Sequence, residues 1–306
     1  MLDLPYRVLQ RSADMEYRHG DNRMVEIDRQ TTQMKNATRS ASILCLALLG
    51  ACGGGGQSES LLDNAQPTAV FTPVSASTCA TLAGDQTLLL GDYAITTNTW
   101  GRAGISNFTE CISATTLGKV TGNVAVQTGI TARIDWNWPY TAFSVKAYPE
   151  IIYWPGGKAL QPIALGEVGS LTVSHDVALS ATGDYNLSYD LWVDSSALPG
   201  QWPHKAEVMI KLQGTWTDVP VVDTVSFDGF PYDVIVGPGG GGQWKLIVFQ
   251  SRTALLKASI PIKPLIDYLV QQQHLLSTDY LSTIEFGSEH IQGLGSVTIH
   301  SYNVTR

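Results

Sequence analysis

Short segments in which apolar and polar residues alternate recur between residues 86 and 304. Side chains of a β-strand point alternately to its two faces, so this period of two predicts strands. The segments span residues 86–96, 111–117, 122–138, 143–154, 169–179, 185–194, 207–212, 224–236, 244–250, 280–286 and 295–304. Because Gly, Pro, Asn and Asp separate them, the pattern is typical of an all-β sandwich, barrel or jelly roll.

One segment, residues 261–276, has the period of a helix. Its apolar residues lie at positions i, i+3, i+4 and i+7: Ile262, Leu265, Ile266 and Leu269. This spacing predicts one amphipathic helix packed on the outside of the sheets. The run P-G-G-G-G at residues 238–242 lacks the Gly-Lys-Ser/Thr of a phosphate loop and opens no helix, so we expect a mobile hairpin tip there.

The strand predicted at residues 206–212 reads A-E-V-M-I-K-L and has two unlike faces. Val208, Ile210 and Leu212 form its apolar face, and Glu207, Met209 and Lys211 form the other. The first face is expected in a hydrophobic core. A carboxylate, a thioether and a cation in a row either belong to a solvated outer face or line a working cleft.

The chain before residue 53 shows none of this alternation. Residues 1–33 are polar, and we interpret them as an upstream extension read from too early a start or as a disordered segment. Residues 34–52 place basic residues before an apolar run too short to span a bilayer, followed by small residues, which is typical of an export signal. The ending L-G-A-C resembles a bacterial lipoprotein box, in which the cysteine carries lipid, so Cys52 is the expected lipidation site.

Residues 53–77 contain many Gly and Ser residues and few bulky apolar ones, which predicts a flexible linker from the membrane. Residues 78–306 then form one domain, a length that suits a single all-β sandwich. The protein is therefore expected outside the cytoplasm, either anchored by lipid at the bacterial cell surface or in the periplasm, or secreted.

The composition narrows the possible partners. The formal net charge is -8, which argues against a polyanion such as nucleic acid. Charged residues make up only 15% of the chain, whereas Gly, Trp and Tyr number 29, 8 and 12. Few charges and many aromatic residues suit an extracellular β protein that handles neutral polymers.

The chain has four cysteines. Cys45 would leave with the signal and Cys52 would carry the lipid, so Cys79 and Cys111 remain in an oxidising compartment. We expect a disulfide between them, and the alternative is two free buried thiols. The chain contains neither C-x-x-C nor H-x-x-x-H, so no metal site is expected.

A second group of carboxylates stands near the C-terminus, in I-E-F-G-S-E-H at residues 284–290. With a period of two, Glu285 and Glu289 share a strand face. Glycoside hydrolysis needs such a partner for Glu207, because one carboxylate attacks the anomeric carbon while a second, protonated carboxyl gives its proton to the leaving oxygen. No G-x-S-x-G motif supports serine-type hydrolysis, and His290 and His300 are expected to make local hydrogen bonds.

These motifs resemble glycoside hydrolase family 12. A-E-V-M-I-K-L is similar to the family's nucleophile strand, E-[LIV]-M-I-W, and F-G-S-E is similar to its acid/base strand, F-G-[TN]-E. Further pieces follow in the family's order: N-T-W-G at 98–101, Cys111, D-W-N-W at 135–138, V-K-A-Y at 145–148, Y-D-L-W at 189–192, the helix, and G-S-V at 295–297. The resemblance covers nearly all of residues 79–302.

The resemblance implies a β-jelly roll of two curved antiparallel sheets with a long cleft on the concave face and one packed helix. It also implies retaining endo-hydrolysis of β-1,4-glucans such as soluble cellulose, mixed-linkage glucan or xyloglucan. No cofactor or metal is implied, the partner is the β-glucan itself, and nothing in the chain demands more than a monomer.

The resemblance also assigns roles to individual residues. Glu207 matches the nucleophile and Glu289 the general acid/base, expected about 5–5.5 Å apart. Asp190 matches the aspartate that hydrogen-bonds the nucleophile, and by like-charge repulsion it should hold or share a proton. Asn98 and Trp100 match residues that bind sugars on the non-reducing side. Met209 matches the methionine beneath the scissile sugar.

Some positions stay open at this stage. Trp136 and Trp138 share a strand face and are either core residues or a sugar platform. Glu285 is a rival to Glu289 as the acid. Lys211 stands where the family has tryptophan, which puts a cation on the cleft face beside the leaving-group sugar or the acid, and D-V-P at 218–220 replaces the usual G-P-x-G turn. The alternatives are a glucan-binding jelly roll without catalysis and a β-1,4-xylanase.

Overall fold

The computed structural model describes residues 69–198, 202–218 and 220–306. The expected upstream segment, the export signal, the lipidation site Cys52 and most of the expected linker lie outside the described residues. Within them, the first strand, β1 (Ser75–Cys79), begins before the expected domain boundary at residue 78. It pairs with β4 (Thr109–Thr121), so residues 75–77 belong to a sheet and not to a linker. The polar sequence S-A-S-T concealed this edge strand.

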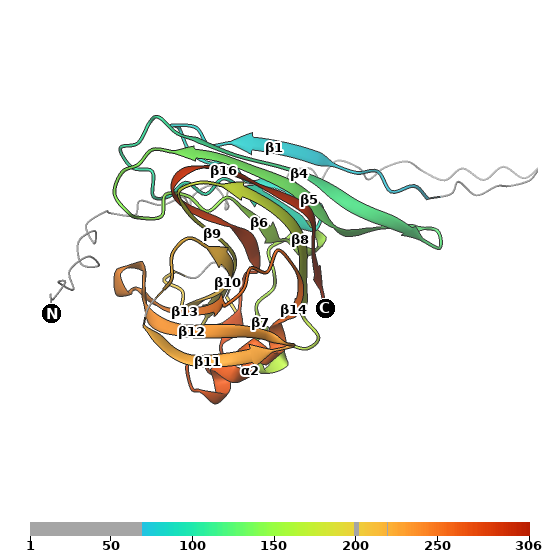
Figure 1. Cartoon of the computed structure of the whole chain (residues 1–306). Coiled ribbons are helices and arrows are strands. Elements are labelled where there is room, and N and C mark those ends of the chain that lie inside the picture. The colour runs from blue at the N-terminus through green and yellow to red at the C-terminus, as the bar shows by residue number, and fades with distance from the viewer. Residues whose placement is uncertain (1–68, 199–201, 219) are drawn as a thin grey trace, which may run out of the picture. The chain divides into compact units, whose positions relative to one another are not determined.

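The fold is built from two sheets that share one long strand, β16 (Glu285–Thr305) (Figure 1). The first sheet runs in the order β1-β4-β5-β16-β8-β14, with β5 (Val124–Trp138), β8 (Thr172–Ala181) and β14 (Lys257–Pro261). The second runs in the order β2-β3-β6-β16-β9-β10-β13-β12-β11. Its strands are β2 (Leu88–Leu90), β3 (Tyr93–Thr96), β6 (Glu150–Tyr153), β9 (Asp184–Asp194), β10 (Ala206–Gly214), β11 (Val221–Phe227), β12 (Phe230–Gly239) and β13 (Trp244–Ser251).

β16 changes sheets near its middle. Its first part pairs with β6 and β9, and its second part pairs with β5 and β8. At the changeover Gly293 has φ 98°, and a Cβ there would lie 2.2 Å from the carbonyl oxygen of Thr182. Only glycine permits this approach, so Gly293 lets one strand serve both sheets.

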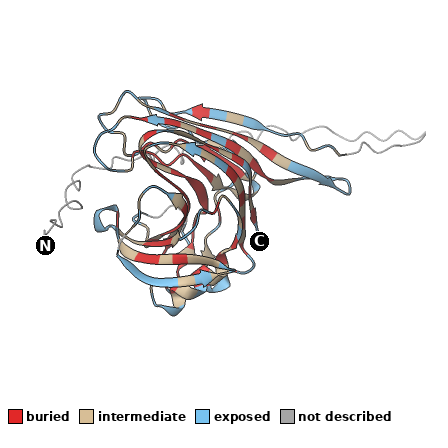
Figure 2. Ribbon diagram, in the orientation of Figure 1, coloured by how far each residue is buried: buried red, intermediate tan, exposed pale blue. Residues whose placement is uncertain are grey.

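The core lies between the two sheets. It joins first-sheet residues such as Ile134 and Val297 to second-sheet residues such as Leu191 and Val208. Figure 2 shows buried residues along most strands, whereas β11, at the edge of the second sheet, is largely exposed. The all-β fold of two curved sheets is confirmed, with one departure: β10 and β13 run parallel. The reason is that β11 and β12 form a hairpin at the edge, so the chain returns beside β10 in the same direction.

The predicted helix is confirmed as α2 (Ile262–Gln271), and its buried residues are Ile262, Leu265, Ile266 and Leu269. It ends five residues earlier than expected. Gln273 adopts φ 58°, and the N–H of His274 donates to the carbonyl of Leu269, which closes the last turn. Tyr268 packs against Phe227 and Phe249, so the helix covers β11 and β13.

The remaining described elements are short. They are β7 (Ile163–Ala164), β15 (Tyr280–Leu281) and three single turns of 3₁₀-helix at Pro155–Gly157, Leu165–Glu167 and Gly240–Gly242. No helix among the described residues is long and apolar enough to cross a membrane.

Candidate active site

The second sheet presents a row of polar residues on one face. Val208, Ile210 and Leu212 lie in the main core, as the alternation of β10 predicts. Met209 instead packs with Ile235 and Val248 in a separate apolar cluster, so the face that carries Glu207 is not the core face. Register places three cross-strand pairs on this same face: Glu207 with Trp192, Met209 with Asp190, and Lys211 with Ser188. β16 adds Glu285 opposite Asp190 and Glu289 opposite Asn186.

Glu207 is half-buried and tightly hydrogen-bonded. Trp244 donates its indole N–H to Glu207 Oε2 over 2.6 Å. The carboxyls of Glu207 and Asp190 also share a hydrogen bond. Burial raises the pKa of Glu207 to about 7, although both of these hydrogen bonds lower it. Glu207 can therefore carry its negative charge near neutral pH while part of its side chain stays exposed.

The glycine run holds Trp244 in place. β12 and β13 form a hairpin in which Gly239 pairs with Trp244, so the expected hairpin is confirmed, and the mobility of its tip stays a prediction. A Cβ on Gly239 or Gly240 would lie within 2.2 Å of the Trp244 indole. The edge of Trp192 packs on the same indole, with ring centroids 5.3 Å apart. The glycines thus make room for the side chain that orients Glu207.

Glu289 is half-buried and held by one amide. The side chain of Asn186 donates to Glu289 Oε2, and Asn186 Oδ1 accepts the backbone N–H of Glu289. Burial, and next the charge of Glu207, raise the pKa of Glu289 to about 7. The charge on one carboxyl therefore affects the protonation of the other.

Asp190 is buried between the other carboxyls. Burial, and next the charge of Glu207, raise the pKa of Asp190 well above its usual value. A hydrogen bond between two carboxyls needs one proton, and the strongly raised pKa assigns it to Asp190. Asp190 is then a neutral donor to Glu207.

Glu285 belongs to a second, deeper pair. Its carboxyl is 8% exposed and hydrogen-bonds that of Glu150, which is 4% exposed. Burial raises the pKa of both groups, so the pair holds a proton. Glu150 Oε1 also accepts a hydrogen bond of 3.0 Å from the Asn98 amide. Because Glu285 is enclosed and engaged, Glu289 is the carboxyl that can meet a substrate.

Asn98 and Trp100 lie just after β3, on the far side of β6 and β16 from β10. Asn98 has φ 38°, and its side chain is fixed by Glu150. Trp100 is 56% exposed. An exposed indole next to an oriented amide can bind a neutral polymer, because a sugar ring stacks on the former and hydrogen-bonds the latter.

Lys211 does not present its ammonium to a substrate, which corrects its predicted role in substrate binding. The side chain is 2% exposed. Its Nζ donates to the carbonyl of Trp216 over 2.8 Å and to Asp218 Oδ2 over 2.9 Å, and it lies 4.3 Å from the centre of the Trp216 ring. Burial lowers the pKa of Lys211, whereas Asp218 raises it. The cation anchors the loop after β10.

Trp136 and Trp138 are core residues, so their predicted role as a sugar platform is wrong. They are 3% and 1% exposed. Trp136 stacks on His290 with ring centroids 3.9 Å apart, and Trp138 donates to Glu110 Oε2 over 2.7 Å. His290 bonds Glu110 and Ser288, a local role as expected. The alternation of β5 already indicated this, because Trp136 and Trp138 share a face with Ile130 and Ile134, whereas the opposite face is polar.

The described part of the chain contains a disulfide between Cys79 and Cys111, which are directly paired across β1 and β4. Asn186 and Glu150 were not singled out from the sequence. Asn186 shares a period-two face with Asp190, so this signal was present. Trp244 could not be separated from the other tryptophans without the hairpin register.

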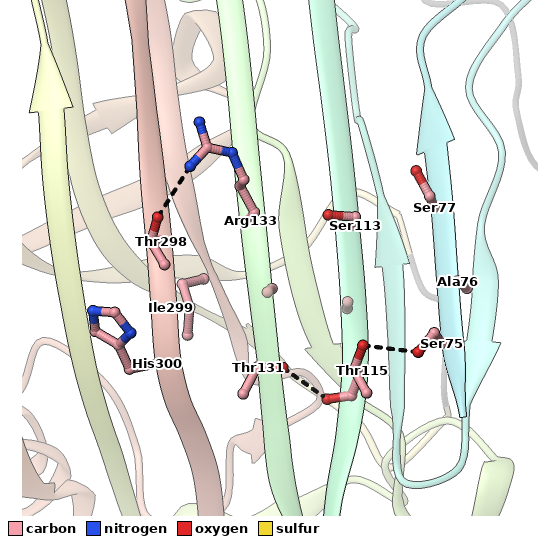
Figure 3. Close-up of a pocket in the computed structure, with 12 residues that line it drawn as sticks. Ser75, Ala76, Ser77, Ser113, Thr115, Thr131, Arg133, Thr298, Ile299 and His300 are labelled. Atoms are coloured by element: carbon pink, nitrogen blue, oxygen red, sulfur yellow. Dashed lines mark hydrogen bonds between the residues drawn. The ribbon is translucent and has the colours of Figure 1, made fainter. Parts of the chain in front are cut away.

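A hollow of about 590 Å³ lies on the first sheet, away from the carboxylates (Figure 3). Its side chains are mainly hydroxyls, and several bond one another, as Thr115 and Ser75 do. Arg133 reaches across to Thr298. This surface carries no carboxylate pair among the lining residues, so the reactive groups are those of the second sheet.

Comparison with known proteins agrees with this geometry. The sequence model of glycosyl hydrolase family 12 matches residues 91–305. Endoglucanase S of Pectobacterium parmentieri is 28% identical over 69% of this chain and 81% of its own length. The xyloglucan-specific endo-beta-1,4-glucanase A of Emericella nidulans is 26% identical over 72% of this chain and 87% of its own.

Among solved structures, the native family 12 xyloglucanase from Bacillus licheniformis superposes with a TM-score of 0.62 and 26% identity. The match covers 76% of this chain and 99% of that one. The family match spans β3 to β16 and so includes every carboxylate described above. The chain belongs to glycosyl hydrolase family 12.

Proposed function

We propose that this family 12 glycosyl hydrolase, an endo-β-1,4-glucanase, cleaves soluble β-glucans with retention of anomeric configuration. Glu207 is the nucleophile and Glu289 the general acid/base. The observation that carries the proposal is that these two half-buried carboxyls share one face of the second sheet, where the charge of Glu207 helps to raise the pKa of Glu289 to about 7. Paired carboxyls with unequal surroundings are what double displacement at a glycosidic carbon requires.

In the first step, a carboxylate oxygen of Glu207 attacks the anomeric carbon and forms a glycosyl ester. The bond from that carbon to the leaving oxygen breaks, and the proton of Glu289 moves to this oxygen. Trp244 and Asp190 donate to Glu207, so they hold the attacking carboxylate in place and keep it charged. Asn186 orients Glu289 toward the same substrate.

In the second step, Glu289 accepts a proton from water as the water oxygen attacks the anomeric carbon. The ester bond breaks, and Glu207 leaves as a carboxylate. Asp190 remains a neutral donor throughout, so no third negative charge opposes the charge that returns to Glu207. Met209 would lie beneath the reacting sugar, and Asn98 with Trp100 would bind the sugars on the non-reducing side.

The test compares the full chain with its Glu207→Gln variant. Release of reducing ends is measured on mixed-linkage β-glucan, carboxymethylcellulose, xyloglucan and xylan. We expect the wild type to cut at least one glucan and the variant to lose about a thousandfold, roughly 4 kcal/mol of barrier. Proton NMR of the first product gives the stereochemistry: a β-anomer supports retention, and an α-anomer contradicts it.

A matched pair of variants tests the acid. Glu289→Gln should abolish most turnover of polysaccharide, whereas Glu285→Gln should cost far less, because Glu285 is enclosed with Glu150. Equal losses in the two variants would contradict the choice of Glu289. Binding of glucan without turnover by the wild type would favour the non-catalytic alternative, and turnover of xylan alone would favour a xylanase.

For the N-terminal region we propose export, with lipid on Cys52 and a monomeric catalytic domain. The support is the sequence pattern of residues 34–52 alone. Mass spectrometry of the mature N-terminus from bacterial membranes tests this proposal. A mature protein that begins elsewhere than Cys52, or that lacks acyl chains, would contradict it.

A further inference from the structure

Glu110 on β4 and His290 on β16 form a buried polar pair behind the active site. They are 1% and 0% exposed, and His290 Nδ1 lies 2.8 Å from Glu110 Oε2. Trp138 donates its indole N–H to the same oxygen, and Trp136 stacks on the imidazole. Burial of a carboxyl and an imidazole costs free energy. The reaction proposed above uses neither group, so their contacts indicate what else they do.

The contacts of His290 lead to Ser288. The Ser288 hydroxyl donates its one proton to the backbone carbonyl of Asn186 over 2.5 Å. Its oxygen lies 3.0 Å from His290 Nε2 and accepts a hydrogen bond from that nitrogen. His290 therefore carries a proton on Nε2, and the contact between Nδ1 and Glu110 needs one more proton. Glu110 thus fixes which nitrogen of the imidazole serves Ser288.

The same chain of hydrogen bonds ends at Glu289. Asn186, which receives the Ser288 proton on its backbone carbonyl, holds Glu289 with both ends of its side-chain amide. The amide nitrogen donates to Glu289 Oε2, and Oδ1 accepts the backbone N–H of Glu289. Ser288 and His290 lie on the buried face of β16, and Glu289 lies on the opposite face. The bonds therefore connect the core to the active-site face.

Backbone pairing of β16 is irregular around Glu289. Its pairing with β9 shifts register between His290 and Gln292. On the other side, its pairing with β6 ends at Gly287, and the next contact in register is an isolated bridge between His290 and Ala147. A strand with irregular pairing holds its side chains less strictly. The bonds through Ser288 and Asn186 supply a further restraint at this point.

We propose that His290 is a positioning residue for Glu289 that acts through Ser288 and Asn186, with Glu110 keeping the imidazole in the required tautomer. The proposal rests on the proposed function, because it concerns the role of Glu289 as the acid/base. A general acid that is misplaced by about 1 Å can lose on the order of a hundredfold in rate. Loss of the restraint should therefore slow the steps in which Glu289 transfers a proton.

The test uses two substrates that differ in their need for an acid. Cleavage of cellohexaose releases a sugar hydroxyl that takes a proton, whereas dinitrophenyl β-cellobioside releases a phenolate that needs none. Ser288→Ala and His290→Leu each break the chain of bonds. We expect both variants to lower kcat/KM about thirtyfold for cellohexaose and less than about twofold for the dinitrophenyl glycoside. Equal losses on the two substrates, or no loss on either, would overturn the proposal.

Two further variants separate positioning from stability. Ser282 is also a buried serine, and its hydroxyl donates to the carbonyl of Trp192 on β9 over 3.0 Å. Ser282→Ala should lower the melting temperature about as much as Ser288→Ala does, with no selective loss on cellohexaose. His290→Gln keeps an N–H that can reach Ser288, so it should restore most of the activity on cellohexaose. A selective loss in Ser282→Ala, or no rescue by His290→Gln, would contradict the proposal.

A last measurement does not depend on turnover. The side-chain amide of Asn186 donates to a carboxyl, so its proton NMR signals should exchange slowly with water in the wild type and in Ser282→Ala. Ser288→Ala and His290→Leu should exchange them faster. Unchanged exchange in a wild type that cuts glucan would overturn the positioning role and leave the proposed function intact. If the wild type cuts no glucan and exchange still responds, the proposed catalysis fails while the positioning of Glu289 stands.

Discussion

Trp244 donates its indole N–H to Glu207 Oε2 over 2.6 Å, and two glycines in the hairpin make room for that indole. This hydrogen bond favours the charged form of Glu207. In the Trp244→Phe variant the pKa of Glu207 should therefore rise, and the acid limb of the kcat/KM profile should move to higher pH. We expect about a tenfold loss at pH 6 and a smaller loss at pH 8. Trp100→Phe, on the exposed indole, is the control that should leave the limb in place.

Variants of Asp190 test whether this residue acts on Glu207 as a hydrogen-bond donor or through a negative charge. Because its pKa is raised well above the usual value, it is neutral where Glu207 is charged. Asp190→Asn keeps a neutral donor, so we expect a loss of about tenfold with an unchanged acid limb. Asp190→Ala removes the donor, so the pKa of Glu207 and the acid limb should both rise, with a loss of about a hundredfold. An acid limb that moves equally in both variants would show that Asp190 acts through its charge.

Lys211 affects the other limb of the pH profile. Its positive charge lowers the pKa of Glu289, whereas the negative charge of Asp218 raises it. Lys211→Met removes the cation and leaves Asp218 unpaired, so the proton on Glu289 should be held more tightly. The alkaline limb of kcat/KM should then move to higher pH. Lys211→Arg keeps the charge, and its limb should stay close to that of the wild type.

The buried carboxyls also make stability depend on pH. The pKa values of Glu150, Asp190 and Glu285 are raised in the folded chain, so folding favours their protonated forms. This contribution is complete below the ordinary carboxyl pKa and is lost as the pH rises through the folded values. We expect a melting temperature that falls between pH 5 and pH 8.

A single variant tests the source of this dependence. Glu150→Gln can accept from Asn98 and donate to Glu285, so no shared proton is needed. It should raise the melting temperature by a few degrees at pH 8, with little change at pH 5. Glu167→Gln, on an exposed side chain, should alter neither value. A wild-type melting temperature that is flat across this range would contradict the explanation.

Alternation alone predicted much of this fold, because strands buried on one face leave a period of two in the sequence. The β10 strand and the α2 helix were identified in this way. β1 and β14 were missed, because edge strands such as S-A-S-T-C bury little and so lack apolar alternation. Residues 143–154 were assigned too much strand, since only Glu150–Tyr153 pairs in a sheet.

The site was less predictable than the fold. The motifs around Glu207 and Glu289 identified the carboxyls, and a shared period placed Glu285 beside them. Neither motif could reveal that Glu285 meets Glu150, because Glu150 lies on β6, far from β16 in the sequence. The Lys211 ammonium was expected to face the cleft, but the register of a strand fixes only the direction of a side chain and not what covers its tip.

Both sheets stay incomplete during synthesis until β16 has been made. The strand that carries Glu289 is the central member of both sheets, and it is the last strand described. Until residues 285–305 emerge from the ribosome, β5, β6, β8 and β9 each lack a neighbour along one edge. Unpaired strand edges attract other chains, so the nascent protein is exposed to misassembly until β16 has been made. Closure of both sheets and placement of the acid/base are then one event.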